Sequence, residues 1–198
     1  MPLNPVPTYA ARLLAGLALL LLAAGLSLPS TRAHATTVPE AGGFSLTDQT
    51  GRRVTGADLK GRPYALFFGF THCPDVCPTA LYELSLVLGK LGPGADALDV
   101  LFVTVDPDRD TQEQLATYLG SFDPRIRGLR GTAEQTAAAA RAFKATYRRV
   151  PLEDGDYTMD HTAVIYLVDR EGRLFETVDY RDDIDRQVAA FRRLLATP

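Results

Sequence analysis

The chain has 198 residues, of which 46% are hydrophobic and 23% charged, enough for one compact domain and too few for two ordinary ones. Its 21 Lys and Arg residues and 24 Asp and Glu residues give a formal charge of −3. We do not expect such an acidic chain, with no long run of one sign, to bind the phosphate backbone of nucleic acids or to be disordered throughout.

The first 35 residues have the layout of an export signal. Arg12 precedes an apolar run from Leu13 to Leu28, and the small-residue triplet Ala33-His34-Ala35 follows. This order is typical of a cleaved signal peptide. The alternative is a retained membrane anchor, since the run approaches the roughly 20 residues that span a bilayer. Under either interpretation we expect the rest of the chain to be exported, to the periplasm or to the outer face of the cytoplasmic membrane.

Residues 36–43 form a short predicted tether, and regular hydrophobic patterning begins at Phe44. Short continuous apolar runs indicate buried strands, leucines at helical spacing indicate helices, and pairs of polar capping residues mark helix starts. In chain order, we expect a hairpin over 44–55, a strand over 64–70, a helix with Pro78 in its first turn, a strand over 98–105, helices capped by Asp110 and Thr132, a hairpin of strands over 162–168 and 174–180, and a last helix from Ile184 to Leu195 capped by Asp182 or Asp183.

This order predicts an α/β domain over residues 44–198. Strands that alternate with helices favour a mainly parallel central sheet flanked by helices, and the late hairpin adds an antiparallel edge. With the N-terminal β-hairpin as an extension, the element order is that of a thioredoxin-like fold.

The two cysteines of the chain, Cys73 and Cys77, lie between the first buried strand and its helix. Ligands of open α/β sheets bind beyond the carboxyl ends of strands, so a site is expected here. The C-x-x-x-C spacing brings both sulfurs to one side, either for a disulfide or for one small metal ion, and the helix N-terminus favours thiolate. In an oxidising compartment the pair forms a disulfide unless it is kept reduced or metal-bound.

His161 offers a third ligand at the start of the predicted strand over 162–168, which can lie beside the first buried strand. Two thiolates and one imidazole suit copper in either oxidation state better than zinc, whose structural sites have four ligands. We therefore predict that Cys73, Cys77 and His161 bind one copper ion. Asp160 is a candidate to orient the imidazole.

Two further side chains near these residues are potential copper ligands. His72 adjoins Cys73, but neighbours on an extended segment point to opposite faces, so we expect it to stay outside the site. Met159 has a soft thioether on the same strand face as His161, although core packing is the simpler interpretation.

Asp106, Asp108 and Asp110 form a carboxylate cluster of the kind that binds calcium or magnesium. The glycine of an EF-hand loop is missing, and Asp110 fits as a helix cap. A structural or partner-facing role is the better interpretation of all three.

Three ordered segments resemble the signature motifs of the Sco/SenC family: FTHCPDVCP at residues 70–78, VDPDRDT at 105–111 and DHT at 160–162. The resemblance covers the chain from about Phe44 to Leu195. It implies a thioredoxin-like fold, copper ligation by Cys73, Cys77 and His161, and a redox-active disulfide between the two cysteines. It also implies a membrane-proximal copper chaperone that takes copper from a donor protein and helps to assemble the binuclear copper centre in subunit II of cytochrome c oxidase.

An enzyme is the alternative: a thiol-disulfide oxidoreductase that reduces the acceptor cysteines of that subunit. A thioredoxin-type catalyst usually has C-x-x-C and a proline opposite it, whereas this chain has C-x-x-x-C and the segment at 160–162. A peroxiredoxin-type peroxidase is disfavoured because Thr71 lies two residues before Cys73, not three.

Overall fold

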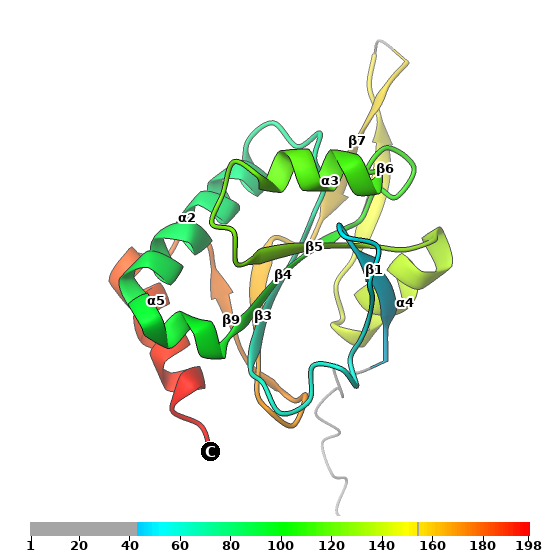
Figure 1. Cartoon of the computed structure of the whole chain (residues 1–198). Coiled ribbons are helices and arrows are strands. Elements are labelled where there is room, and N and C mark those ends of the chain that lie inside the picture. The colour runs from blue at the N-terminus through cyan, green and yellow to red at the C-terminus, as the bar shows by residue number, and fades with distance from the viewer. Residues whose placement is uncertain (1–42, 154) are drawn as a thin grey trace, which may run out of the picture. The chain divides into compact units, whose positions relative to one another are not determined.

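The computed structural model describes residues 43–153 and 155–198 (Figure 1). The leader predicted at 1–35 and all but the last residue of the tether predicted at 36–43 lie outside the described residues. Among the residues that are described, none of the helices is long and apolar enough to cross a membrane.

A seven-stranded sheet with the order β2-β1-β5-β4-β3-β8-β9 forms the centre of the fold. β3 is parallel to β4 and β4 to β5, which confirms a parallel centre, but the other pairs are antiparallel, so the sheet is mixed rather than mainly parallel. Both predicted hairpins, β1–β2 and β8–β9, are confirmed. The strands are β1 (Ser45–Asp48), β2 (Arg53–Thr55), β3 (Tyr64–Gly69), β4 (Asp99–Thr104), β5 (Ile126–Arg130), β8 (Val164–Val168) and β9 (Leu174–Asp179).

Helices flank the sheet, as predicted, and α2 packs beside α5 (Figure 1). Three helices begin at the residues that the sequence indicated. A proline lies in the first turn of α2, a capping box of Thr132 and Gln135 precedes α4, and Asp183 caps α5. The helices are α2 (Val76–Leu91), α3 (Gln112–Leu119), α4 (Ala133–Ala142) and α5 (Ile184–Leu195), with a short 3₁₀ helix at Gly92–Ala97.

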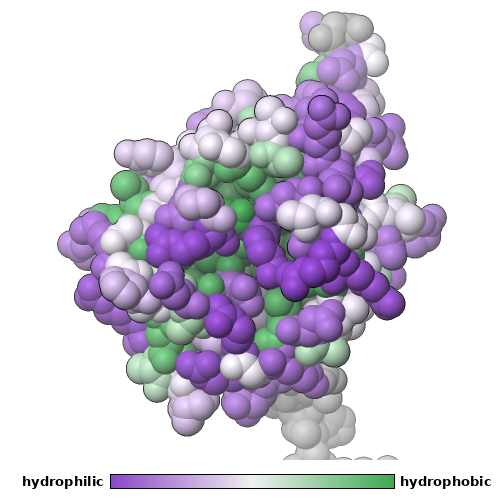
Figure 2. All heavy atoms as spheres, viewed as in Figure 1, coloured by the Kyte–Doolittle hydropathy of each residue, from purple (hydrophilic) through white to green (hydrophobic). Residues whose placement is uncertain are grey.

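The core lies on both sides of the central strands. Every residue of β3 is buried, as are the last five of β4, because these strands have neighbours on each edge and helices over the sheet. Phe67, Phe68 and Phe102 are among the largest fully buried side chains, and burial of each contributes about 1.5–3 kcal/mol. Figure 2 shows one face of the molecule, with hydrophilic residues around a central area where apolar residues reach the surface.

The predicted cap of α3 is wrong. Thr111, not Asp110, precedes the helix and accepts the hydrogen bond from the Gln114 backbone N–H. Asp110 is completely buried and binds other donors, because its carboxylate faces the segment that follows β3.

Two strands were not predicted, β6 (Tyr147–Pro151) and β7 (Tyr157–His161), which pair as a separate two-stranded sheet. In Figure 1 this hairpin extends beyond the seven-stranded sheet at the top of the view. His161 therefore ends β7 and does not begin the buried strand β8, which is a correction to its predicted place. β5 is likewise an addition to the predicted elements.

Candidate metal centre

The C-x-x-x-C segment joins the end of β3 to the start of α2. The backbone N–H of Cys73 donates to Phe70 O at 3.3 Å, which turns the chain back toward the sheet. Cys77 lies in the first turn of α2, and its backbone N–H points to Cys73 Sγ at 3.4 Å. Asp75 precedes the helix, but its side chain makes no capping hydrogen bond to a backbone N–H. The sulfur of Cys73 thus takes the place that an oxygen acceptor usually has at a helix N-terminus.

His161 enters the site from the end of β7. Its Nδ1 lies 3.1 Å from Thr162 O, and since a carbonyl only accepts hydrogen bonds, this contact assigns the proton to Nδ1 and leaves Nε2 with a lone pair. Nε2 lies 3.6 Å from Cys77 Sγ. The rings of Phe67 and Phe70 meet the imidazole edge to face, at centroid distances of 6.1 Å and 5.9 Å, and restrict its rotation.

Three segments far apart in the sequence thus bring two sulfurs and one imidazole nitrogen together. The ligand atoms of Cys73, Cys77 and His161 all lie within 4.8 Å of one another, and this is the one such group of potential metal ligands among the described residues. Ligands bonded to one ion at about 2.0–2.3 Å are at most about 4.6 Å apart, so little movement is needed to hold an ion. Cys77 is buried, whereas Cys73 and His161 are partly exposed, so the site opens to solvent on one side.

The two thiols are free and electrostatically unequal. The hydrogen bond from the Cys77 side chain, together with those from the backbone N–H groups of Cys77 and Asp75, holds the pKa of Cys73 well below its ordinary value. The pKa of Cys77 is raised, by its hydrogen bond to Cys73 and then by burial. Cys73 is therefore the more acidic of the two thiols and the first to become a thiolate.

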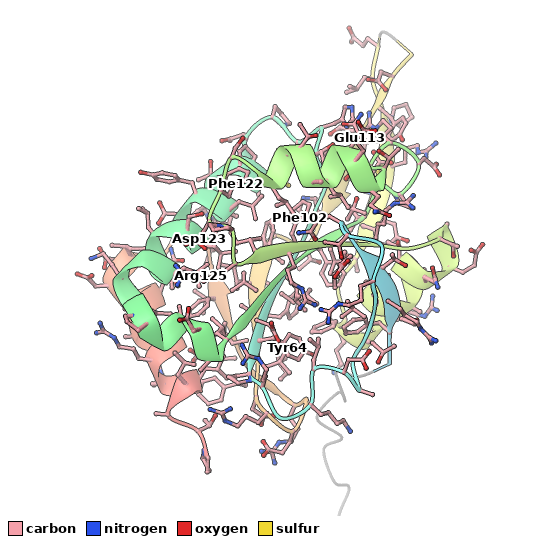
Figure 3. All side chains as sticks on the ribbon, in the orientation of Figure 1. Tyr64, Phe102, Glu113, Phe122, Asp123 and Arg125 are labelled. Carbon is pink, nitrogen blue, oxygen red and sulfur yellow. The ribbon has the colours of Figure 1, made fainter. Side chains whose placement is uncertain are left out.

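Gly69, the last residue of β3, leaves the space that Cys77 occupies. An ideal Cβ at this position would lie 2.9 Å from Cys77 Sγ and 2.5 Å from Cε2 of Phe102 (labelled in Figure 3). Only glycine allows so close an approach, so the sequence of β3 determines where the buried sulfur lies.

Asp110 fixes the loop that carries Cys73. Its carboxylate accepts hydrogen bonds from the Thr71 backbone N–H at 3.0 Å, from Thr71 Oγ1 at 2.6 Å and from Thr104 Oγ1 at 2.5 Å. Sequence reasoning missed this role because Asp110 also fitted a capping pattern. The carboxylates of the predicted cluster do not converge: Asp106 is buried against Arg109, and Asp108 is exposed.

In this structure Asp160 pairs with Arg148, and no contact between its carboxylate and the imidazole of His161 is found. Successive side chains of a strand point to opposite faces, and Asp160 forms an ion pair with Arg148 at 2.9 Å while His161 is held by the Thr162 carbonyl. A cavity of about 180 Å³ adjoins these residues. This cavity makes His161 accessible from the side of the β6–β7 hairpin.

The other two potential ligands lie outside the group of three. His72 is 43% exposed, and its Nδ1 contacts Thr71 Oγ1 at 3.1 Å. Met159 packs against the hydrophobic core. Both positions agree with the interpretation from the sequence.

The fold and the site together define a thioredoxin-like protein in which paired cysteines at the end of a central strand meet a histidine from a separate hairpin. The model of the SCO1/SenC family matches residues 32–196. The chain therefore belongs to the SCO1/SenC family.

Relatives with known structures share this fold over most of their length. ScoI from Bradyrhizobium japonicum, solved with copper bound, is 47% identical with a TM-score of 0.72, covering 77% of this chain and 98% of that one. Yeast Sco1 with copper bound is 32% identical with a TM-score of 0.73, covering 81% and 91%. The mitochondrial SCO2 homolog of Bos taurus is 42% identical over 164 residues, which are 78% of this chain and 62% of that protein. The chain thus spans less than two thirds of the length of this SCO2 relative.

Proposed function

We propose that the chain binds one copper ion through Cys73, Cys77 and His161 and delivers it to the binuclear copper centre of cytochrome c oxidase subunit II. The observation that carries the proposal is the convergence of two sulfurs and one imidazole nitrogen within 4.8 Å. This donor set suits copper, and relatives with copper bound support the choice of ion. Three protein ligands leave the ion open to exchange, as a chaperone requires.

Each ligand contributes a different step. Cys73, already a thiolate and partly exposed, is the first contact for copper brought by a donor protein. Cys77 loses its proton when the ion binds, because a metal ligates the thiolate form. His161 supplies the Nε2 lone pair without losing a proton. Release runs through the exposed side, where acceptor thiolates replace these ligands one at a time.

Copper titration of the reduced protein tests the binding step. We expect one ion per chain for the wild type and a loss of affinity of about tenfold or more for His161→Ala and Cys73→Ala. His72→Ala is the matched control, since this histidine lies next to Cys73 but outside the group of three ligands, and it should bind like the wild type. Equal affinity of His161→Ala and wild type would contradict the assignment.

Delivery is tested by mixing the copper-loaded protein with the reduced, copper-free soluble domain of subunit II. After the two proteins are separated, the copper content of each should show that copper has moved from this protein to the acceptor. Copper that stays on this protein in the presence of excess acceptor would refute delivery while leaving the binding site intact.

A thiol-disulfide reductase is the second candidate, and the opposite pKa shifts of the two cysteines favour it. The Cys73 thiolate would attack an acceptor disulfide and form a mixed disulfide with one acceptor sulfur, releasing the other as a thiolate. Cys77, after losing its proton, would then attack Cys73, so that the acceptor ends with two thiols and this protein with a Cys73–Cys77 disulfide. A Cys77→Ser variant should trap the mixed disulfide with oxidised subunit II; absence of any trapped species would exclude this activity.

We further propose that residues 1–35 export the chain and that 44–198, joined by the tether at 36–43, act in the periplasm or at the outer face of the cytoplasmic membrane. The sequence supports a signal peptide and an anchor alike. The mass of the protein recovered from its native membrane fraction decides between cleavage and retention, and recovery of the full-length chain from the cytoplasm would contradict export.

A further inference from the structure

The position of His161 relative to the cysteines depends on a hairpin that is not part of the main sheet. β6 and β7 pair only with each other within the described residues, and the seven-stranded sheet begins again at β8. In Figure 1 the hairpin projects beyond that sheet. His161 is joined to β8 by Thr162 and Ala163, and its ring contacts Phe67 and Phe70, but no strand pairing to the main sheet holds β7 itself. Side-chain contacts of the hairpin are therefore what holds β7 at its other end.

These contacts gather on Tyr157, the first residue of β7. The guanidinium of Arg109 lies 3.7 Å from the centroid of its ring, and that of Arg149 lies 3.9 Å away. Arg109 Nη1 also donates to Tyr157 O at 2.8 Å, and the tyrosine hydroxyl donates to Asp106 Oδ1 at 2.8 Å. Arg149 pairs with Asp108. Tyr157 is thus attached by its ring, its hydroxyl and its backbone carbonyl.

Arg109 is the central member of this group. Its side chain is only 17% exposed, and its Nε donates to the carboxylate of the buried Asp106. Its Nη2 is buried without a hydrogen-bond partner among the described residues.

The loop that carries Arg109 is also attached to the cysteine segment. Asp110, the next residue, accepts two hydrogen bonds from Thr71, which lies two residues before Cys73. One short loop after β4 therefore contacts the hairpin that carries the histidine on one side and the segment that carries the cysteines on the other.

We infer that Arg109 is a positioning residue for His161: it holds β7 through Tyr157, so that the imidazole stays beside the two sulfurs. Tyr157 and His161 lie on the same face of β7, roughly 13 Å apart along the strand, so Arg109 acts through the strand and not by contact with the ion. A test of this inference by copper affinity rests on the proposed function. A test by nuclear magnetic resonance of the metal-free protein does not.

A double-mutant cycle isolates the effect. Arg109→Lys keeps the charge but loses the planar group that contacts the ring and pairs with Asp106. We expect copper affinity to fall about tenfold in the wild-type background and by less than about twofold in the His161→Ala background, where there is no imidazole to position. An equal loss in both backgrounds, or no loss in the first, would overturn the inference.

Arg125→Lys is the matched control. Arg125 pairs with Asp123, two residues away, at 2.6 Å, and both are labelled in Figure 3. The variant removes a comparable guanidinium–carboxylate pair elsewhere in the fold. Copper affinity should equal that of the wild type, and a tenfold loss here would mean that any such change disturbs the site.

The metal-free protein gives an independent readout. The rings of Phe70 and His161 lie 5.9 Å apart, so their protons should give a nuclear Overhauser effect in the reduced protein without copper. We expect this effect to weaken or vanish in Arg109→Lys and to persist in Arg125→Lys; full persistence in Arg109→Lys overturns the inference. Should that variant fail to fold, Tyr157→Phe removes only the hydroxyl bond to Asp106 and should weaken the same signal. A wild type that binds no copper would refute the proposed function and leave this test unaffected.

Discussion

Replacing Gly69 by alanine tests whether the close packing of Cys77 and Phe102 against β3 requires a glycine at this position. The added Cβ would lie 2.5 Å from Phe102 Cε2 and 2.9 Å from Cys77 Sγ. Non-bonded carbon atoms are ordinarily about 3.5–4.0 Å apart, so each neighbour would have to move by roughly 1 Å. Phe102 and Cys77 are both completely buried, and neither can move into solvent.

Overpacking of this kind costs about 1–3 kcal/mol. The reduced freedom of alanine in the unfolded chain returns about 0.4–1 kcal/mol, so we expect a net loss centred on about 1.3 kcal/mol, with an upper limit of about 2.6 kcal/mol. The assay is urea unfolding of the reduced, metal-free protein, in which the midpoint should fall without a change in slope.

Gly89→Ala is the matched control for this substitution. Gly89 lies on the exposed side of α2, and a Cβ there meets nothing within 4 Å. Because alanine is the better helix former, this variant should gain up to about 1 kcal/mol. If Gly69→Ala is as stable as the wild type, or if its urea midpoint rises as that of Gly89→Ala does, the argument is refuted that no room for a Cβ exists beside Cys77.

Three other predictions concern single side chains. The alkylation rate of Cys73 in the reduced protein should stay nearly constant from about pH 8 to about pH 6, because its lowered pKa keeps the reactive thiolate; the rate falls only below that range, as pH drops through this pKa. Asp110→Ala should lower the free energy of unfolding by about 2–4 kcal/mol in urea, since it leaves the Thr71 donors without their acceptor. Asp160→Asn should leave copper affinity unchanged in the same titration as the wild type, because Asp160 faces Arg148 and not the imidazole.

Each of these has a result that contradicts it. An alkylation rate that drops by about eightyfold over that pH interval would be the behaviour of an ordinary thiol. Asp108→Ala changes an exposed carboxylate of the same loop and is the control for Asp110→Ala. If both variants lower the free energy of unfolding equally, the burial of Asp110 does not explain its effect. A tenfold loss of copper affinity in Asp160→Asn would restore the role predicted from the sequence.

The central strands and the paired cysteines could be predicted because their signals are local. The apolar runs of β3 and β4 and the C-x-x-x-C spacing need no knowledge of the rest of the fold. β5 was missed because it reads IRGLR, so arginines and a glycine interrupt the apolar pattern even though three of its five residues are buried. The β6–β7 hairpin did have a signal, the Asp-Gly pair at 154–155, which is typical of a hairpin turn.

Side-chain partners were harder to predict than elements. Asp110 and Thr111 are both good capping residues, and only the fold shows that Asp110 is needed by Thr71. Asp160 adjoins His161 in sequence, but alternation along the strand turns it to the other face, where it meets Arg148. The group around Tyr157 depends on contacts between residues about 50 positions apart, which a single sequence does not reveal.

X-ray absorption spectroscopy of the protein loaded with one equivalent of copper tests the central claim most directly. The account predicts two sulfur ligands and one imidazole nitrogen, with the imidazole scattering missing in His161→Ala and one sulfur missing in Cys73→Ala. An environment without imidazole in the wild type, or one with more than two sulfurs, would contradict the three-ligand site formed by Cys73, Cys77 and His161.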